Sequence, residues 1–439
     1  MRNEKMAGLL CKLEKFGEKA FLTSIIASLL FLSLSSPVYS SSSEDAEALY
    51  DPTQVLSFHI QLSDSDWQTI RNDETFDVEV PCYFWVEDAD PPMDPIYVSI
   101  RRKSATALGN KISFKIDINE YEGEHPDAVD KWMGVKKLSL ENGDDTDTLA
   151  ECLAWQMHKE AAAILSDSEI LYSPGRAAWV TVTLHRVSGG SVSETPLGVY
   201  VNVEQVDKQF LKNRDMWLSD ETWLIKKDDR GPVEFKESPD DAEEPSPTQD
   251  TLKSFYPFIT ELGSPKKREI LAAPIVPEEY LDPLINIDAM LALGAVNAFS
   301  TNPDELFNKD KNAFYVDYDP LTALKRAYFP WDLDAVIRKT NIDIYESGLA
   351  KKPGPYQVAI LGYSVFRDRY DYIMNELVCE SSPFVSRLKA VLNEVEPILV
   401  PLLEADSNNN LGDAPSVRFD QLRAWLDERV LNVQSQLLG

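Results

Sequence analysis

The chain has 439 residues, of which 44% are hydrophobic and 26% are charged, so it holds enough apolar material for two or three globular lobes with sizeable cores. Its formal net charge is −30, and this excess of acids excludes non-specific binding to nucleic acids and docking on anionic membranes. Acidic peptides and phosphorylated polymers are poor partners for the same reason unless the fold gathers a local basic patch, so we expect a basic or neutral partner.

The first 40 residues have the pattern of an export signal. Basic residues recur through residues 2–19, and an apolar run follows at residues 20–36. Val38 and Ser40 suit the positions before a cleavage site that follows Ser40. We predict a signal peptide at residues 1–40 and an exported protein (periplasmic, secreted or at the cell surface), with an uncleaved anchor as the alternative because the basic region is long. No later stretch reaches the roughly 18 apolar residues of a membrane-spanning helix, so no membrane span is expected after cleavage.

Residues 41–48 (SSSEDAEA) are small and polar, and we expect a polar tether there. From residue 49 onward, short stretches alternate apolar with polar residues, which is the period of a strand with one buried face. Such stretches occur at residues 54–62, 76–86, 96–101, 111–118, 135–140, 177–186, 196–203 and 223–227, and helical patterns at residues 64–72 and 149–165. Residues 49–215 are therefore predicted to form a β-rich lobe.

Helical patterns dominate the second half of the chain. Apolar residues recur with a helical period at residues 252–262, 277–281, 287–298, 363–379, 383–403 and 418–437. We predict a mostly helical second lobe over residues 216–439, and hence an α+β fold.

Residues 295–334 carry the clearest chemical pattern. Asp304 comes shortly after an apolar segment, Asn312 stands directly before an aromatic run, and Asp332 and Asp334 follow a second aromatic run. Acids and amides at the ends of rigid elements can converge in space. One acid to take a proton, with an amide and one or two acids to hold a hard cation, is the inventory of a phosphoryl-transfer site.

The same pattern has a structural interpretation, because a hairpin with an acidic turn on the surface of an acid-rich chain produces similar spacing. Other site chemistries find less support. The chain has 4 His, scattered without the spacing of metal ligands, and it contains neither a Gly-x-Ser-x-Gly nucleophile motif nor a phosphate-binding loop of the Walker type.

The segment resembles the CotH family, named for the spore coat protein H kinases. That family carries an Asp, then an Asn that leads an aromatic strand, then a Pro-Trp-Asp-x-Asp element. Here these are Asp304, Asn312 followed by Ala-Phe-Tyr, and the Pro-Trp-Asp-Leu-Asp of residues 330–334, which is the most specific match. The resemblance implies an atypical protein-kinase-like bilobal fold, use of ATP with Mg²⁺ or Mn²⁺, and phosphorylation of Ser or Thr in secreted or coat proteins.

The resemblance also implies roles for these residues. Asp304 would orient or deprotonate the acceptor hydroxyl. Asn312 and Asp332 would hold Mg²⁺ or Mn²⁺, with Asp334 as a second ligand or a supporting group. Which of the two acids is the primary ligand stays open.

Two departures from the family pattern leave further assignments open. An insert at residues 305–311 lengthens the spacing before Asn312, so Asn308 or Asp310 can take the place of a metal ligand. The turn at residues 102–104 lacks the family's glycine, which puts phosphate binding by its backbone in doubt.

In the β-rich lobe, Lys111 and Lys115 share one face of a predicted strand because side chains alternate along it. The resemblance implies that one of them contacts the nucleotide phosphates, and we favour Lys115 because it lies deeper in the apolar run. Glu151, in the first turn of the long predicted helix, would pair with this lysine, ahead of Glu160. Glu204, in the family's Gly-x-Tyr-x-x-x-Glu pattern, would contact the nucleotide near the junction of the lobes.

We therefore expect an exported CotH-like atypical kinase that transfers the γ-phosphate of ATP to Ser or Thr of secreted or surface proteins, with such a protein as its partner and no nucleic acid. A non-catalytic binding protein of the cell surface or coat, on the same fold, is the alternative, as fungal members of the family imply. The acids of the core segment favour the enzyme. Transfer of phosphate or AMP to a non-protein acceptor is a third possibility.

Overall fold

The computed structural model describes residues 42–87, 94–228, 234–239, 285–309, 311–318, 325–345 and 357–438. The predicted signal peptide at residues 1–40, the predicted helices at residues 252–262 and 277–281, and Asp310 lie outside the described residues. In the part of the chain that the structure describes, no helix combines the length and hydrophobicity that crossing a membrane requires.

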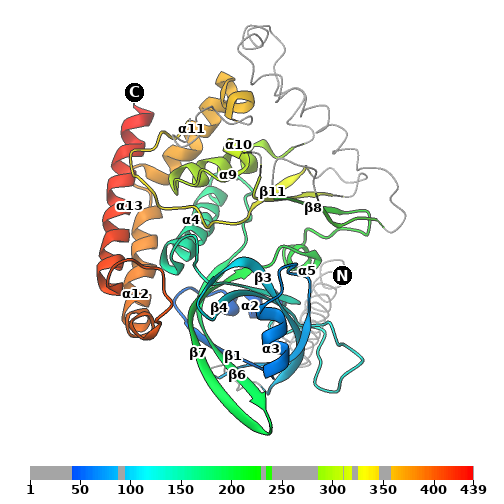
Figure 1. The fold of residues 1–439 in the computed structure, drawn as a ribbon. Coiled ribbons are helices and arrows are strands. Elements are labelled where there is room, and N and C mark those ends of the chain that lie inside the picture. Colours follow the sequence, from blue (N-terminus) through cyan, green and yellow to red (C-terminus); the bar gives the residue numbers. More distant parts are fainter. Residues whose placement is uncertain are drawn as a thin grey trace, which may run out of the picture.

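The first half of the chain forms a closed barrel of seven strands, seen at the bottom of Figure 1. Most neighbouring strands are antiparallel, and β1 closes the barrel by pairing in parallel with β6. In barrel order the strands are β1 (Leu56–Ser63), β2 (Val80–Val86), β3 (Ile96–Leu108), β4 (Lys111–Asp117), β5 (Lys137–Glu141), β7 (Ser191–Glu204) and β6 (Ala177–Ser188). A closed sheet leaves no unpaired edge strand.

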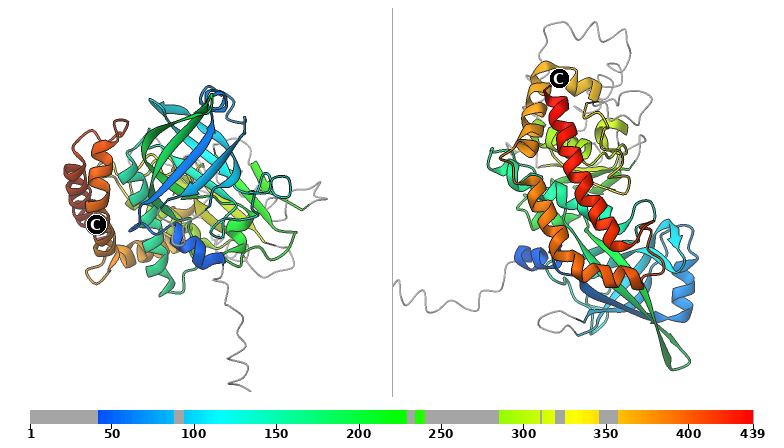
Figure 2. Two further views of the ribbon diagram at one scale, coloured as in Figure 1. Left: turned by 90° about the horizontal axis from the view of Figure 1, so that it is seen from below. Right: turned by 90° about the vertical axis from the view of Figure 1, so that its left-hand side faces the viewer.

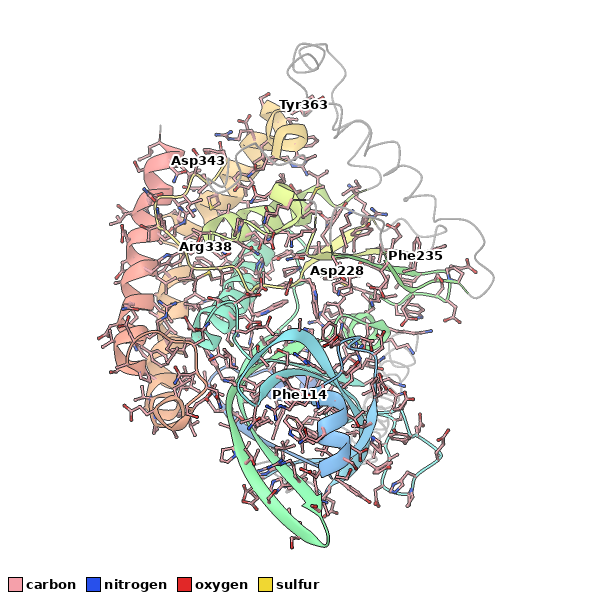
Figure 3. The ribbon with its side chains drawn as sticks, viewed as in Figure 1. Phe114, Asp228, Phe235, Arg338, Asp343 and Tyr363 are labelled. Carbon is pink, nitrogen blue, oxygen red and sulfur yellow. The ribbon has the colours of Figure 1, made fainter. Side chains whose placement is uncertain are left out.

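Apolar side chains at alternate positions along the strands fill the inside of this barrel. On β4, Phe114 and Ile116 are buried in the barrel core, where Figure 3 labels Phe114, while Lys115 between them faces outward. Helix α3 (Asp64–Arg71) packs on the strands and adds Trp67 to the same core. The barrel is therefore a packed core and its outer face is where polar side chains can meet other parts of the chain.

Residues 42–48 of the predicted polar tether are instead helical. Helix α2 (Ser42–Leu49) places Ala46 and Leu49 in the barrel core, together with Tyr50. The Arg176 guanidinium lies 5.3 Å from the centre of the Tyr50 ring. Burial of Ala46, Leu49 and Tyr50 stabilises this helix, and it outweighs the tendency of serine and acidic residues to form a loose segment.

The second half builds a larger core from helices. These are α4 (Thr148–Ser166), α9 (Ile287–Phe299), α11 (Ser364–Val378), α12 (Phe384–Ala405) and α13 (Pro415–Leu437). Although α4 follows the barrel strand β5, it packs on α9, α11 and α12 and contributes to their core. Figure 2 shows α12 and α13 side by side, running from the helical half down to the barrel.

A four-stranded sheet above the barrel completes the second half (Figure 1). Its strands, in order, are β11 (Ala327–Pro330), β10 (Ala313–Asp317), β8 (Trp223–Lys227) and β9 (Glu234–Glu237). Shorter elements are α5 (Lys208–Lys212), α10 (Leu306–Lys309) and the π-helix η2 (Gln357–Leu361). Strand β11 packs against α9, which places the end of this sheet beside the helices.

The predicted mixed α+β class is confirmed. Every strand and helix that we predicted within the described residues is present, but some ends differ. Strand β2 begins at Val80 where we predicted residue 76, and β7 begins at Ser191 where we predicted residue 196. The largest difference is in β3, which runs on to Leu108 where we expected a loop after residue 101. The pairing of β3 with β4 shifts register between Arg102 and Ala107, so a bulge accommodates the extra length.

Candidate active site

The pairing of β10 with β11 joins the two parts of the core segment. Their ladder continues beyond the last strand pair, where the Trp331 N–H donates to the Asn312 carbonyl at 3.2 Å. The Phe314 and Trp331 rings meet edge to face with centroids 5.1 Å apart. The hydrogen bond and the ring contact fix the backbone immediately before Asp332.

Two of the predicted metal ligands have left-handed backbones. Asn312 has φ 55° and Asp332 has φ 58°, a region that few residues other than glycine, Asn and Asp adopt. Such conformations persist where the surrounding structure enforces them, and they concentrate at functional sites. Asn312 Nδ2 donates to the Asp304 carbonyl at 2.9 Å, and no group in the described part of the chain donates to Asn312 Oδ1. This oxygen is therefore available to a ligand.

The carboxylates of Asp332 and Asp334 are crowded by other acids. Burial, the charge of Asp332 and a hydrogen bond with Asp145 raise the pKa of Asp334 to about 8. The Asp332 residue is exposed to solvent, but the protein around its carboxylate partly desolvates that group and raises its pKa. The charge of Lys103 opposes this rise, and the charge of Glu141 adds to it. Neighbouring carboxyl groups without a cation between them share a proton.

Glu151, in the first turn of α4, lies in the same group. Burial is the main reason that the pKa of Glu151 lies well above its ordinary value, and Glu141, Asp334 and Asp332 raise it further against the opposing charge of Lys103. Acids from both halves of the chain thus converge on one place. The group comprises Glu141, Asp145, Glu151, Asp332 and Asp334, which we name the acid cluster.

Lys103 is the lysine of this site, and our sequence analysis missed it. It forms an ion pair with Glu141, and its Nζ lies 4.9 Å from the centre of the Trp331 ring. Lys226 of β8 lies against the same ring, with its Nζ 5.4 Å from the centre. The signal that was available is the Arg-Lys-Ser run at residues 102–104, which we took for a turn and which continues β3.

Asp304 lies between two lysines. Its carboxylate oxygens are 2.5 Å from Lys309 Nζ and 2.6 Å from Lys311 Nζ. Burial favours the protonated form of Asp304, but the hydrogen bonds and charges of the two lysines outweigh it and lower the pKa below its ordinary value. Asp304 is therefore ionised at neutral pH. Its charge also acts on Asp334, so it stands beside the acid cluster.

Lys111 lies elsewhere. It is completely buried and pairs with Asp406, with 2.8 Å between Nζ and Oδ2, and its Nζ lies 5.1 Å from the centre of the Tyr200 ring. The structure does not support a contact between Lys111 and nucleotide phosphates, because its ammonium is already committed to a buried carboxylate. The prediction failed because a partner 295 residues away cannot be seen in the local pattern.

Lys115 is not brought to the acid cluster either. The charges that act on it are those of Lys137, Arg101, Asp117 and Lys236, and the lysine that acts on Glu151 is Lys103. Within the described residues no ion pair joins Lys115 to Glu151, and the lysine whose charge acts on Glu151 is Lys103, which itself pairs with Glu141.

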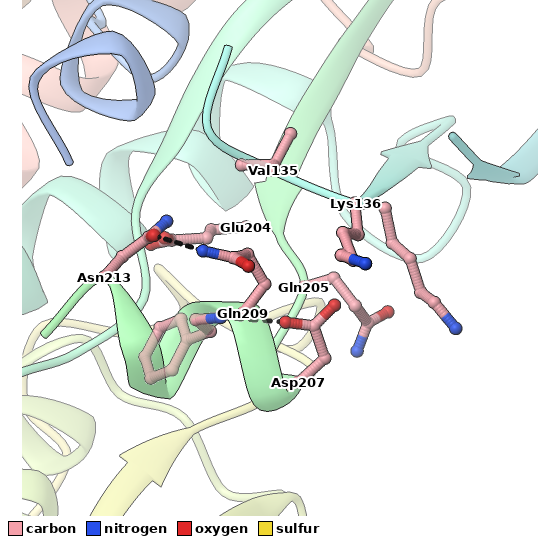
Figure 4. Close-up of a pocket in the computed structure, with 9 residues that line it drawn as sticks. Val135, Lys136, Glu204, Gln205, Asp207, Gln209 and Asn213 are labelled. Carbon is pink, nitrogen blue, oxygen red and sulfur yellow. Dashed lines mark hydrogen bonds between the residues drawn. The ribbon is translucent and has the colours of Figure 1, made fainter. Parts of the chain in front are cut away.

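Glu204 is held by two arginines. Its carboxylate oxygens lie 2.7 Å from Arg176 Nη2 and 2.6 Å from Arg214 Nη2. Burial opposes ionisation, but the arginines outweigh it and lower the pKa of Glu204 to about 2. Glu204 also lines a small pocket beside α5, with Gln205 and Asp207 among its neighbours (Figure 4). The space inside is about 10 Å³, which suits one water molecule and not a purine, so this pocket does not seat the nucleotide base.

Two of the residues predicted to bind a metal, Asp332 and Asp334, belong to the acid cluster. Among the described residues, no group of three or more His, Cys, Asp and Glu side chains is arranged to enclose a metal ion. Asp332, Asp334 and Asn312 Oδ1 are the oxygen groups that would hold Mg²⁺, which would complete its coordination with phosphate oxygens and water. The raised pKa of Asp334 fits this use, since a carboxyl group that holds a proton in the absence of a cation releases it when a cation binds.

Comparison with known proteins gives a family match. The family model described as CotH kinase protein matches residues 98–430, which include most of the barrel and the whole acid cluster. No curated protein matches the chain.

Proposed function

This chain belongs to the CotH family, whose model is that of a kinase protein, and on that premise we propose that it is an exported atypical kinase. It transfers the γ-phosphate of ATP, in the presence of Mg²⁺ or Mn²⁺, to Ser or Thr hydroxyls of secreted or surface proteins. The resemblance of residues 1–40 to a signal peptide supports export.

One observation carries the proposal. Asp304, Asn312, Asp332 and Asp334, which are spread over about thirty residues of sequence, converge beside the cations of Lys103 and others. Acids of raised pKa next to lysines make a place where a metal and a triphosphate can neutralise one another's charge. A surface hairpin with an acidic turn would not bury Glu151 against the same acids.

The residues divide between two tasks. Asp332 and Asp334, with Asn312 Oδ1, would hold the divalent cation, which when bound neutralises charge on the phosphates. Lys103, fixed over Trp331, and Lys226 on the same ring would neutralise the remaining phosphate charge.

Asp304 would act on the acceptor. The two lysines that keep it ionised also fix its orientation, so its carboxylate can accept the hydrogen bond of a Ser or Thr hydroxyl. In the transfer, a bond forms between the hydroxyl oxygen and the γ-phosphorus, and the bond from that phosphorus to the β–γ bridging oxygen breaks. ADP leaves with the bridging oxygen, and the hydroxyl proton passes to Asp304 or to solvent.

The test uses the purified protein with γ-labelled ATP, Mg²⁺ and a basic Ser-rich protein as acceptor. We expect transfer by the parent, loss of at least a hundredfold in Asp304→Asn, and little change in nucleotide affinity for that variant. Asp427→Asn, which removes a carboxylate from the exposed face of α13, is the matched control and should transfer like the parent.

Two outcomes would decide against the proposal. Undiminished transfer by Asp304→Asn would remove Asp304 from its role. Metal-dependent nucleotide binding without transfer to itself or to any acceptor would favour the non-catalytic binding protein on the same fold.

A further inference from the structure

The outer face of the barrel carries a lysine that the acid cluster does not use. Lys115 projects outward from β4 and is half-buried. In the strand register it lies between Arg101 of β3 and Ser139 of β5. Lys137 of β5 lies two residues further along the same face, opposite Asp117.

Lys115 differs from these neighbours in having no acidic partner. Lys137 Nζ lies 2.9 Å from Asp117, and Arg101 Nε lies 3.7 Å from Glu79. Among the described residues, no carboxylate stands within ion-pair distance of Lys115. In a chain with a net charge of −30, an uncompensated, half-buried cation is the exception to the general distribution of charge.

The surroundings of Lys115 are cationic on more than one side. Burial, then the charges of Lys137 and Arg101, lower the pKa of Lys115 to about 8, while Asp117 opposes the change. Lys236 of β9 adds to the effect from the sheet above the barrel, where Figure 3 labels its neighbour Phe235. Because Lys137, Arg101 and Lys236 each have an acidic partner, the charge of Lys115 is the one that a bound anion would balance.

This place connects with the candidate active site along β5. Ser139, beside Lys115, donates from Oγ to Glu141 Oε1 at 3.1 Å, and Glu141 is the ion-pair partner of Lys103. Alternate residues on a strand are about 7 Å apart. With the reach of the Lys103 side chain added, the far end of the acid cluster, at Asp332 and Asp334, lies on the order of 10–15 Å from Lys115.

We propose that Lys115, flanked by Arg101 and Lys137, binds an acidic side chain of the polypeptide acceptor. The proposal rests on the proposed kinase function and adds a substrate preference to it. A span of 10–15 Å corresponds to roughly three to four residues of extended chain, so the acidic residue lies about that far from the phosphorylated Ser or Thr.

The charge distribution of ATP argues against the nucleotide as occupant. All of its charge is on the triphosphate, which must lie at the acid cluster with Lys103 and Lys226. The base and the sugar are neutral. A cation that lies 10 Å or more away therefore has no partner on a nucleotide whose phosphates are in place, whereas an acceptor peptide that runs along the barrel can present a carboxylate there.

The experiment uses two sets of Ser-containing peptides that differ only by Glu or Gln, with this residue scanned over the positions on either side of the Ser. Binding to the intact protein is followed by fluorescence anisotropy, and transfer from γ-labelled ATP is followed in parallel. At one or two positions, about three to four residues from the Ser, we expect Glu to lower both the dissociation constant and KM by about tenfold, the effect of one charge-assisted hydrogen bond.

Substitutions of Lys115 test whether this residue causes the preference for Glu peptides. Lys115→Gln should abolish the difference between Glu and Gln peptides, and Lys115→Arg should retain most of it. Lys131→Gln, which removes an exposed lysine before β5, is the charge-matched control and should keep the full preference. The preference of the parent should also fade as pH rises through about 8, because Lys115 then loses its charge.

The results separate the two proposals. Absence of transfer with a Lys115-dependent preference in binding would overturn the kinase function and leave the acidic subsite in place. Equal binding of Glu and Gln peptides at every position would overturn the subsite, whether or not transfer occurs. A loss of ATP affinity in Lys115→Gln, without a change in peptide preference, would show that Lys115 serves the nucleotide and would also overturn it.

Discussion

Lys111 at the start of β4 donates a hydrogen bond to Asp406 at the end of α12, with Nζ and Oδ2 2.8 Å apart and 295 positions between them in the chain. Both side chains are shielded from water, with 0% and 1% exposed. Asp406 Oδ2 also accepts from the Val199 N–H at 3.0 Å. Gly198, with φ +100°, leaves open the space that this carboxylate occupies, since a Cβ there would overlap it. One ion pair thus joins the barrel to the helical half.

The first prediction concerns this pair. Lys111→Met should lower the free energy of unfolding by about 3 kcal/mol or more, because it leaves a buried carboxylate without its cation. Asp406→Asn in the same background should recover part of the loss, since the amide oxygen still accepts from Val199 and carries no charge. Urea unfolding of the three proteins measures both effects. A tenfold loss of ATP affinity in folded Lys111→Met would instead return Lys111 to a phosphate-binding role.

The second prediction concerns the lysine of the candidate site. Lys103→Met should raise the dissociation constant of ATP with Mg²⁺ at least tenfold, because it removes the cation that stands between Glu141 and Trp331. Titration with a fluorescent ATP analogue measures this. Lys131→Met is the control and should bind like the parent. Unchanged affinity in Lys103→Met would mean that the triphosphate lies elsewhere.

The third prediction ranks the two acids of the Pro-Trp-Asp-Leu-Asp element. Asp332→Asn should eliminate metal-dependent nucleotide binding, because the backbone next to Trp331 is the more rigidly held. Asp334→Asn should weaken binding by roughly 10–100-fold. A thermal-shift assay with ATP alone and with ATP plus Mg²⁺ compares them. If Asp334→Asn is the more damaging change, the order of the two ligands is reversed.

The fourth prediction follows from the raised pKa of Asp334. Between its unfolded value of roughly 3.9 and its folded value of about 8, the folded protein holds a proton that the unfolded chain has released. Without metal, the parent therefore loses stability as pH rises through this range, and Asp334→Asn loses less, because other buried acids of raised pKa, such as Glu151, remain. The stability gained by the variant should grow from pH 5 to pH 8, which urea unfolding at several pH values will show. A gain that is independent of pH would contradict the shared proton.

The fifth prediction concerns Glu204 between its two arginines. Glu204→Gln should cost about 3 kcal/mol or more at pH 7, because Arg214 is left partly buried without a counter-charge and Arg176 keeps only the exposed Glu47. The folded pKa of about 2 lies below the unfolded value of roughly 4.3, so the contribution of Glu204 is complete above pH 4.3 and is lost as pH falls toward 2. Denaturant melts at pH 7 and pH 3 should therefore show a smaller difference between parent and variant at pH 3. An ATP affinity that falls while stability is unchanged would indicate a nucleotide contact instead.

Local order could be read from the sequence alone. The alternation in residues 111–118 and the helical period in residues 287–298 determined β4 and α9, because the burial of one face depends on side chains that are neighbours in the chain. The order of Asp304, Asn312 and the Pro-Trp-Asp-Leu-Asp element indicated the family, which the match over residues 98–430 confirms. The polar stretch at residues 41–48 gave no local sign of a helix, since Ala46 within it and Leu49 and Tyr50 after it reach the barrel core only after folding.

The identity of the site lysine was decided by tertiary structure. Lys103, Lys111 and Lys115 look alike in sequence, since each lies on or beside a strand with its side chain on the outer face. The bulge in β3 and the packing of Trp331 place Lys103 at the acid cluster. The packing of α12 against the barrel brings Asp406 into contact with Lys111. Periodicity defines which face a side chain occupies, but the partner that covers this face comes from a distant part of the chain. Its position depends on how the two cores pack together, and no local pattern records that.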